Sequence, residues 1–173
     1  IDTETTSLNP HQAKLVGISL SYKIGSACYI PLAHKNYKNL DELKTLKILK
    51  SYLEDKSIKK IGQNIKFDYI VLLNNDIKLN SIEDTMLISY TLEAGNHRHN
   101  LDTLSELYLD HKNISYKELV GSGKSKINFS EVKIDKATEY AAEDADTTLR
   151  LYNHLKPRLD SEKLNKVYEN FEK

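Results

Sequence analysis

The first part of the chain shows the hydrophobic pattern of β-strands. Residues 1–6 combine β-branched and polar side chains, and strand-like runs follow at residues 14–22 and 27–32. Residues 23–26, which include Gly25, have the composition of a hairpin turn. The pattern therefore predicts three consecutive antiparallel strands at the N-terminal end.

Apolar residues recur at helical spacing from residue 40 onward. The first predicted helix has leucines at positions 40, 43, 46, 49 and 53, and Asn39 or Asp41 can cap it. A short strand is expected at residues 59–62. A helix capped by Asn64 is then expected to run through Asp68 to about Leu73. Residues 77–79 can form another brief strand.

The second half of the chain is mainly helical in pattern. Helices are predicted at residues 85–92, at residues 101–109 and from about Asp135, and Pro157 is expected to kink or end the last one. Between residues 110 and 129 the periodicity fades, and Gly121-Ser122-Gly123-Lys124 is expected to form a mobile loop. Strands that come first and helices that dominate later favour an α/β fold with a mixed sheet.

Composition narrows the class of protein. A length of 173 residues fits one domain, and 39% hydrophobic with 29% charged residues is ordinary for a soluble globular protein. Lysine plus arginine equals aspartate plus glutamate, so net charge gives no general case for nucleic-acid binding. Cys28 is the only cysteine, which excludes an internal disulfide and a cysteine zinc site. No apolar run reaches membrane-spanning length and no signal peptide precedes Ile1. The chain starts abruptly on a predicted strand and ends in a charged, helical-looking segment, so we expect it to be a piece of a longer protein.

Acidic residues supply the candidate chemistry. Asp2 and Glu4 are two apart on a predicted strand, so both carboxylates point to one face. At a few Å they repel by roughly 4 kcal/mol at an effective dielectric constant of about 20, which a divalent cation relieves. Chance alone gives about three or four such pairs in this composition, and each acid taken alone is more often a solvated surface group.

A second acid-bearing pattern lies on the last predicted helix. Tyr140 and Asp144 are four apart and share a face, and neighbouring alanines allow the helix to approach a sheet closely. That approach would bring Asp144 toward the first strand, and Asp68 could arrive from another helix. Glu143 and Asp146 flank Asp144 but point off its face, so they are expected to be solvated or locally paired.

Two other features have simpler interpretations. His97 and His99 lie near Arg98 without a third ligand, so they are interpreted as loop surface rather than a metal site. Gly-Lys-Ser at residues 123–125 resembles the end of a phosphate-binding loop, but the first glycine of such a loop would fall at Glu118. That interpretation fails.

Three segments together resemble a known family. They are Asp2-Thr3-Glu4-Thr5, Gln63-Asn64-Ile65-Lys66-Phe67-Asp68 and Tyr140-Ala141-Ala142-Glu143-Asp144-Ala145-Asp146. In this order they are similar to the exonuclease motifs of DnaQ-like proofreading domains, in particular the 3′–5′ exonuclease domain of bacterial-type DNA polymerase I, a family A polymerase. Supporting stretches are Tyr29-Ile30-Pro31, Asp84-Thr85-Met86-Leu87, residues 121–124 and Val167-Tyr168-Glu169-Asn170. The resemblance implies an α/β, ribonuclease H-like fold: a mixed sheet with three antiparallel N-terminal strands, flanked by helices.

The resemblance also implies roles for individual residues. The metal ligands would hold two divalent ions, Mg²⁺ or Mn²⁺, and are Asp2, Glu4, Asp68 and Asp144. Tyr140 would orient the attacking water. The DNA contacts would comprise apolar grips on the terminal bases and polar contacts to the strand: Leu8, Phe67, Tyr116, Gln63, Asn64 and Arg98. Phe67 departs from the family's usual tyrosine and keeps only the stacking face; for Tyr116 a purely structural role remains the alternative.

The expected function is removal of nucleoside 5′-monophosphates from the 3′ end of single-stranded or frayed DNA, in proofreading during replication and repair. Residues 1–173 would form one exonuclease domain, linked covalently to a polymerase portion through a connection that starts within residues 157–173. The expectation is a monomer without membrane contact, in the bacterial cytoplasm at the nucleoid or in an organelle such as a plastid. A catalytically silent scaffold domain and a related 3′–5′ exoribonuclease are the alternatives.

Overall fold

Two small groups of strands form the centre of the fold. The computed structural model describes residues 1–173, apart from the side chain of Lys124. Strands β1 (Asp2–Thr5), β2 (Leu15–Lys23) and β3 (Ser26–Pro31) form an antiparallel sheet, as predicted. Strands β4 (Lys60–Gly62) and β5 (Ile82–Asp84) pair in parallel. The nitrogen of Ile1 donates to the carbonyl oxygen of Ile61 at 2.8 Å, so β1 lies beside β4 and the two groups adjoin.

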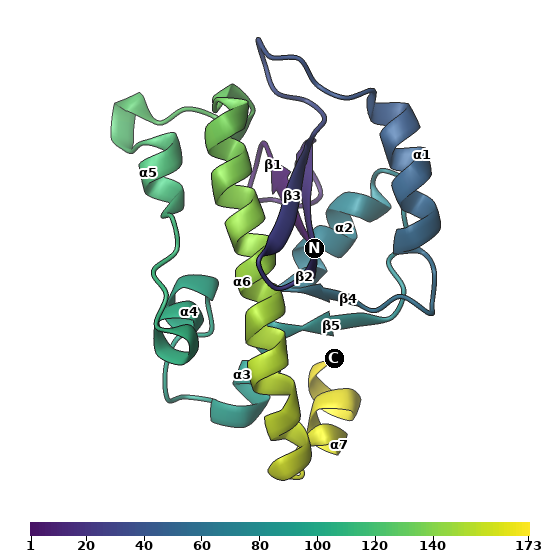
Figure 1. Ribbon diagram of the computed structural model, residues 1–173, viewed down its shortest axis with the longest axis vertical. Helices are drawn as coiled ribbons and strands as arrows, with labels where there is room; N and C mark the ends of the chain where they lie inside the picture. Colours follow the sequence, from purple (N-terminus) through teal and green to yellow (C-terminus); the bar gives the residue numbers. More distant parts are fainter.

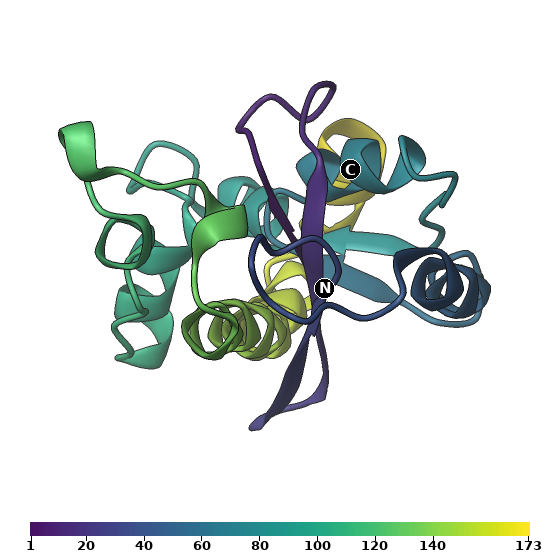
Figure 2. The ribbon, with the colours of Figure 1, turned by 90° about the horizontal axis from the view of Figure 1, so that it is seen from above.

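Helices cover both faces of the strands. On one side lie α1 (Glu42–Leu53) and α2 (Ile65–Leu73). On the other side the long α6 (Ile134–Ser161) crosses the strands, with α3 (Thr85–Glu93), α4 (Leu101–Leu109) and the short α5 (Tyr116–Val120) beyond it (Figures 1 and 2). The α/β class with a mixed set of strands flanked by helices is therefore confirmed.

Three apolar clusters make up the core. One fills the space between β1–β2 and helices α1 and α2, around Ile18 and Leu72. A second, rich in aromatic rings, joins β2 and β3 to the start of α6 and the short helix η2 (Phe129–Glu131). The third packs α3 and α4 on the second half of α6 and includes the fully buried Tyr168. Each cluster includes residues of α2 or α6, the two helices that carry candidate acids.

The C-terminal segment folds back onto the domain. Helix α7 (Asn165–Val167) and the π-helical turn η3 (Tyr168–Glu172) follow α6. The Tyr168 hydroxyl accepts from the backbone nitrogen of Asp84 at 3.1 Å and donates to Glu83 Oε2 at 3.0 Å. Lys173 and Lys156 also pair with Glu83. Hydrogen bonds and ion pairs therefore hold the C-terminal segment against β5.

One expected strand is absent, and one of the two outcomes expected at Pro157 is excluded. Residues 77–79 form no strand: Ile77 and Leu79 are buried in the core, Lys78 N donates to Glu54 Oε1, and the strand follows instead at β5. Helix α6 does not end at Pro157 but continues to Ser161. A proline removes the hydrogen bond to the carbonyl four residues earlier, here that of Asn153. Both residues are exposed, so water can solvate that carbonyl and the helix persists.

The irregular region contains one more helix than expected. Helix α5 begins with a capping box, in which Ser115 and Glu118 bond each other's backbone nitrogens. A short 3₁₀ turn, η1 (Gly123–Ser125), follows. Among the described residues, no helix is both long enough and apolar enough to span a membrane.

Candidate active site

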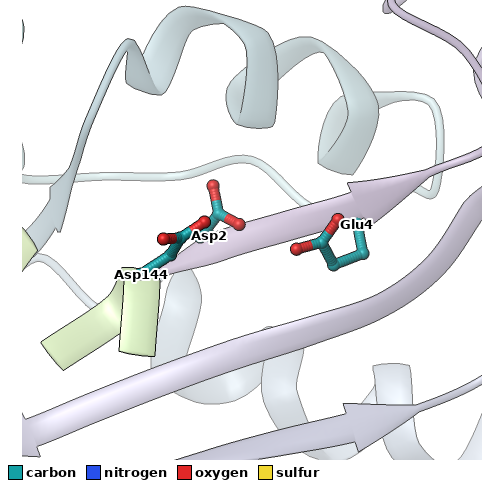
Figure 3. A group of neighbouring side chains, drawn as sticks. All are labelled: Asp2, Glu4 and Asp144. Atoms are coloured by element: carbon teal, nitrogen blue, oxygen red, sulfur yellow. The ribbon is translucent and has the colours of Figure 1, made fainter. Parts of the chain in front are cut away.

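Two elements bring three acids together. Asp2 and Glu4 project from β1 and Asp144 projects from α6 toward them (Figure 3). Each offers a carboxylate oxygen, and these three oxygens lie within 4.8 Å of one another. The predicted approach of Asp144 to the first strand is therefore confirmed. The group has the oxygen-only donor set that hard divalent cations prefer.

Small residues make this approach possible. Ala141 and Ala145 are 0% and 1% exposed where α6 meets the strands. On the strand side, Gly17 pairs with Glu4, and a Cβ at Gly17 would lie only 2.2 Å from the hydroxyl of Tyr29. Glycine at this position therefore leaves room for the Tyr29 ring beside Glu4.

Asp68 belongs to the same cavity but faces differently. It projects from α2, is 2% exposed, and its Oδ1 accepts from Thr3 N at 2.8 Å and Thr3 Oγ1 at 2.6 Å. These two bonds fix its carboxylate against the middle of β1, between the residues that carry the other acids. Three of the four predicted ligands thus form one compact group, and the fourth, Asp68, is held by Thr3 of the same strand.

The acids share an environment that opposes their ionisation. Burial raises the pKa of Asp2 to about 6. Burial, followed by repulsion from the other acids, raises the pKa of Glu4, Asp68 and Asp144 well above the ordinary range. Neighbouring carboxylates without a compensating cation have this effect. The electrostatics are those of a site suited to positive charge.

Asp84, for which the sequence predicted no capping role, orients α2. Asn64 occupies the predicted cap position with φ 58°, but its side chain makes no capping bond. Instead the carboxylate of Asp84 accepts from the nitrogens of Asn64 at 3.0 Å and Ile65 at 2.9 Å. The same carboxylate caps α3 through Met86 N at 2.9 Å. Asn64 therefore stands at the start of α2 as predicted, but the capping oxygen comes from Asp84 on a distant strand.

Tyr140 stands beside Asp144 at the edge of the aromatic cluster. Its ring is 6.2 Å from that of Phe129 and 6.1 Å from that of Tyr116. Burial and then the charge of Asp144 raise the pKa of its hydroxyl, so this group stays protonated at neutral pH. The hydroxyl in turn partly offsets the rise in the pKa of Asp144. Tyr140 is thus a fixed neutral donor next to the acids.

A cleft of about 620 Å³ opens over these groups. Most predicted site residues line it: Asp2, Glu4, Leu8, Gln63, Asn64, Phe67, Asp68, Tyr116, Tyr140 and Asp144. Leu8 lines the cleft and is 86% exposed, so its side chain is available for contact with a ligand. Arg98 is exposed and is absent from the described lining, so the structure does not bring it into the cleft. It lies next to His99, whose carbonyl accepts from Gln63 Nε2 at 2.7 Å.

The cleft also contains residues that the sequence analysis missed. They include Lys126, Ile127 and Asn128. Behind the cleft, buried Asn113 donates to Asp144 Oδ1 at 3.4 Å, while its own Oδ1 has no partner among the described residues. No periodicity marks these positions, since they lie in the segment where regular patterning fades.

The acids flanking Asp144 are not locally paired. Glu143 accepts from His111 Nε2 at 2.9 Å and from Ile114 N at 2.6 Å, which holds the loop that carries Asn113. Asp146 accepts from Gly25 N at 2.6 Å at the tip of the β2–β3 hairpin. Both therefore tie α6 to segments far away in the sequence. The expectation of local pairs is therefore wrong for both, while the two side chains remain partly exposed to solvent.

Comparison with known proteins assigns the chain to a family. Residues 1–160 match the family described as 3′-5′ exonuclease. The chain belongs to the 3′-5′ exonuclease family. Because the match covers β1, α2 and the acid-bearing part of α6, all the acids of the cleft lie inside the exonuclease region.

Curated relatives of this exonuclease chain are much longer proteins. DNA polymerase I of Rhizobium leguminosarum is 46% identical over 192 residues, covering 99% of this chain and 19% of the relative. DNA polymerase I of Pseudomonas aeruginosa is 42% identical over 166 residues, covering 92% of this chain and 18% of the relative. The chain thus spans about a fifth of the length of these two polymerases.

Solved structures with the same fold include proteins at 28% and at 18% sequence identity to this chain. Brucella melitensis NrnC is 28% identical with a TM-score of 0.75, covering 98% of this chain and 76% of that one. The same protein with bound Mg²⁺ is 29% identical with a TM-score of 0.73, covering 97% and 76%. A complex of the POL domain of Pol1 from M. smegmatis, 18% identical with a TM-score of 0.67, shares the fold over 92% of this chain and 23% of that one.

Proposed function

We propose that this chain is the proofreading 3′–5′ exodeoxyribonuclease domain of a bacterial-type DNA polymerase I, and that it depends on two divalent metal ions. The carboxylate group formed by Asp2, Glu4 and Asp144 supports the proposal most directly. Two polymerase relatives at 42% identity or more give the DNA context. The 3′ end of a single-stranded or frayed DNA is the proposed substrate.

The donor set fits Mg²⁺ or Mn²⁺. All the converging ligand atoms are carboxylate oxygens, and burial followed by repulsion among the acids raises their pKa values. Asp2, Glu4 and Asp144 would hold one ion directly, and Asp68 would complete the site for the second. Such ions, when bound, make water more acidic and stabilise the charge that develops on phosphate and leaving oxygens. The Mg²⁺-bound NrnC structure is consistent with this choice.

The protein's own groups would bind and align the strand. The Tyr140 hydroxyl, neutral and close to Asp144, would hold the attacking water in line with the scissile phosphate by a hydrogen bond. Leu8, Phe67 and Tyr116 line the cleft and would grip the terminal bases, while Gln63 and Asn64 would contact the backbone. Arg98 would reach only a part of the strand outside the cleft.

The protein context is proposed from the relatives. A polymerase portion would be linked covalently through a connection beginning within residues 157–173, of which Tyr168 packs firmly on β5. The domain would act as a monomer in the cytoplasm at the bacterial nucleoid, or in an organelle such as a plastid. A silent scaffold is disfavoured because all four acids line one cleft.

A related 3′–5′ exoribonuclease is the second candidate. One similar solved structure, 29% identical, is Brucella melitensis NrnC bound to pGG. The same four acids and the same cleft would serve either substrate, because the attack is on a phosphodiester in both.

The experiment is digestion of 5′-labelled single-stranded DNA and RNA of one sequence, with Mg²⁺, Mn²⁺ or EDTA. The proposal predicts a ladder that shortens from the 3′ end, requires metal, and is faster on DNA. A mismatched 3′ end of a duplex should be cut faster than a paired one, because less unpairing is needed. Internal fragments, undiminished cleavage in EDTA, or no cleavage of DNA would contradict it. Faster cleavage of RNA would favour the second candidate.

A further inference from the structure

A nucleic-acid strand in the cleft faces an electrostatic difficulty. Of the charged side chains that line the described cleft, four are the acids and one is basic: Lys126. Each nucleotide that enters carries a negative phosphate, and bound metal ions compensate charge only near the scissile bond. The next phosphates along the strand need another cation.

The backbone at Lys126 is held in place on both sides. Its nitrogen donates to Gly123 O at 3.3 Å, and Ile127 N donates to Val120 O at 2.9 Å. Two residues further on, Asn128 Nδ2 donates to Thr6 O at 2.8 Å. These bonds tie the segment to the end of α5 and to the loop after β1. The root of the Lys126 side chain is therefore fixed at the cleft wall.

The Lys126 ammonium is available and adjoins an aromatic ring. The side chain is exposed and has no carboxylate partner among the described residues. Its Nζ lies 5.9 Å from the centroid of the Tyr116 ring. That ring is supported from behind by Phe129, which is nearly parallel to it at 9° with 6.4 Å between centroids.

We infer that Lys126 and Tyr116 form one nucleotide subsite, in which the ring stacks on a base and the ammonium binds a backbone phosphate near the 3′ end. Tyr116 lies against Tyr140, which adjoins Asp144, so the subsite serves a nucleotide next to the reacting one. The phosphate is common to DNA and RNA, so the contact does not select the sugar. The inference rests on the proposed function and adds a residue to it.

The test uses single-turnover cleavage of an oligothymidylate with Mg²⁺, at several enzyme and salt concentrations. Lys126→Ala should raise the half-saturating concentration about 3- to 10-fold and reduce the slope of log affinity against log salt by about 0.7, as for one lost phosphate contact on a single strand. The maximal rate should stay within about twofold, because no group beside the reacting atoms is lost. Lys126→Arg should restore the affinity.

Lys117→Ala is the matched control. Lys117 is an exposed lysine next to Tyr116 but does not line the described cleft. Its removal changes net charge by the same amount, so it should leave both affinity and salt slope near those of the wild type. Equal effects of Lys117→Ala and Lys126→Ala would show that only the net charge of the protein affects binding, and this would overturn the subsite.

Uncharged linkages in the oligonucleotide backbone identify the phosphate that Lys126 contacts. Single methylphosphonates are placed at successive linkages upstream of the scissile bond. Neutralising the second or the third linkage should weaken wild-type binding by about the same factor as Lys126→Ala and should have no further effect on that variant. Equal sensitivity of both proteins at every linkage would refute the contact.

A failure of the proposed nuclease function can be distinguished from a failure of the subsite. Fluorescence anisotropy with a labelled oligonucleotide in EDTA measures binding without cleavage, and the Lys126→Ala defect should persist there. If the wild type does not cleave but the defect remains, the proposed activity is wrong and the subsite stands. If cleavage is normal and the defect is absent, only the subsite is wrong.

Discussion

Asp2→Asn should stabilise the metal-free protein at neutral pH. Burial raises the pKa of Asp2 from 3.8 to about 6 in the folded protein. A group whose folded pKa lies above its unfolded pKa stabilises the fold fully only below the unfolded value, and that stabilisation is lost as pH rises through the folded value. Wild type should therefore lose stability from about pH 4 to above pH 6, and asparagine cannot titrate.

The magnitude follows from the two pKa values. Linkage gives a loss of about 1 kcal/mol at pH 4.5 and about 3 kcal/mol at pH 7.5 relative to the fully protonated carboxyl. The advantage of Asp2→Asn over wild type should consequently grow by about 2 kcal/mol between these pH values. Any constant effect of the amide itself cancels in this difference.

The assay is urea unfolding in EDTA at both pH values, followed by circular dichroism because the chain has no tryptophan. Adding Mg²⁺ at about ten times its dissociation constant should stabilise wild type by about 1.4 kcal/mol and the variant less. If the difference in free energy of unfolding between Asp2→Asn and wild type is the same at pH 4.5 and pH 7.5, the raised pKa of Asp2 is refuted. Equal stabilisation by Mg²⁺ would refute its role as a ligand.

Three other predictions address groups around the acids. Tyr140→Phe should lower the single-turnover rate about 10- to 100-fold with unchanged strand affinity, since one orienting hydrogen bond is lost; a rate within twofold of wild type would reject that role. Asp84→Ala should destabilise the fold by about 2–4 kcal/mol in urea unfolding, because both α2 and α3 lose their cap. The control Asp41→Ala, which removes the cap of α1 alone, should cost about 1 kcal/mol. Equal losses for the two variants would contradict the shared cap. Asn113→Ala should weaken Mg²⁺ binding about 10-fold by calorimetry, and unchanged binding would show that the 3.4 Å contact does not orient Asp144.

Short-range pattern was sufficient for much of the fold. Alternation and turn residues located the three antiparallel strands, and the alanine-rich face of the last helix located Asp144 near β1. These features could be predicted because strand and helix periods act within a few residues. The resemblance to exonuclease domains then identified ten of the seventeen residues that line the cleft, among them all four acids.

What could not be predicted are bonds between distant segments. Asp84 replaces Asn64 as the cap of α2, and Thr3 takes one oxygen of Asp68. Glu143 holds the loop before α5 instead of a neighbour on its own helix. Spacing along the chain contains no information on such pairs, because tertiary packing decides which donor reaches which carboxylate. Lys126 was missed for the same reason, since only the folded loop brings it to the cleft.

The most direct test of the account is the rate of nucleoside 5′-monophosphate release from 3′-labelled single-stranded DNA by wild type and by the Asp2→Ala/Glu4→Ala double variant. Both proteins are first shown to be folded by circular dichroism, and Mg²⁺ is saturating. The account predicts mononucleotide release by wild type alone, with EDTA reducing it to the level of the variant. Release by the double variant near the wild-type rate would contradict the assignment of these carboxylates as the metal-binding centre.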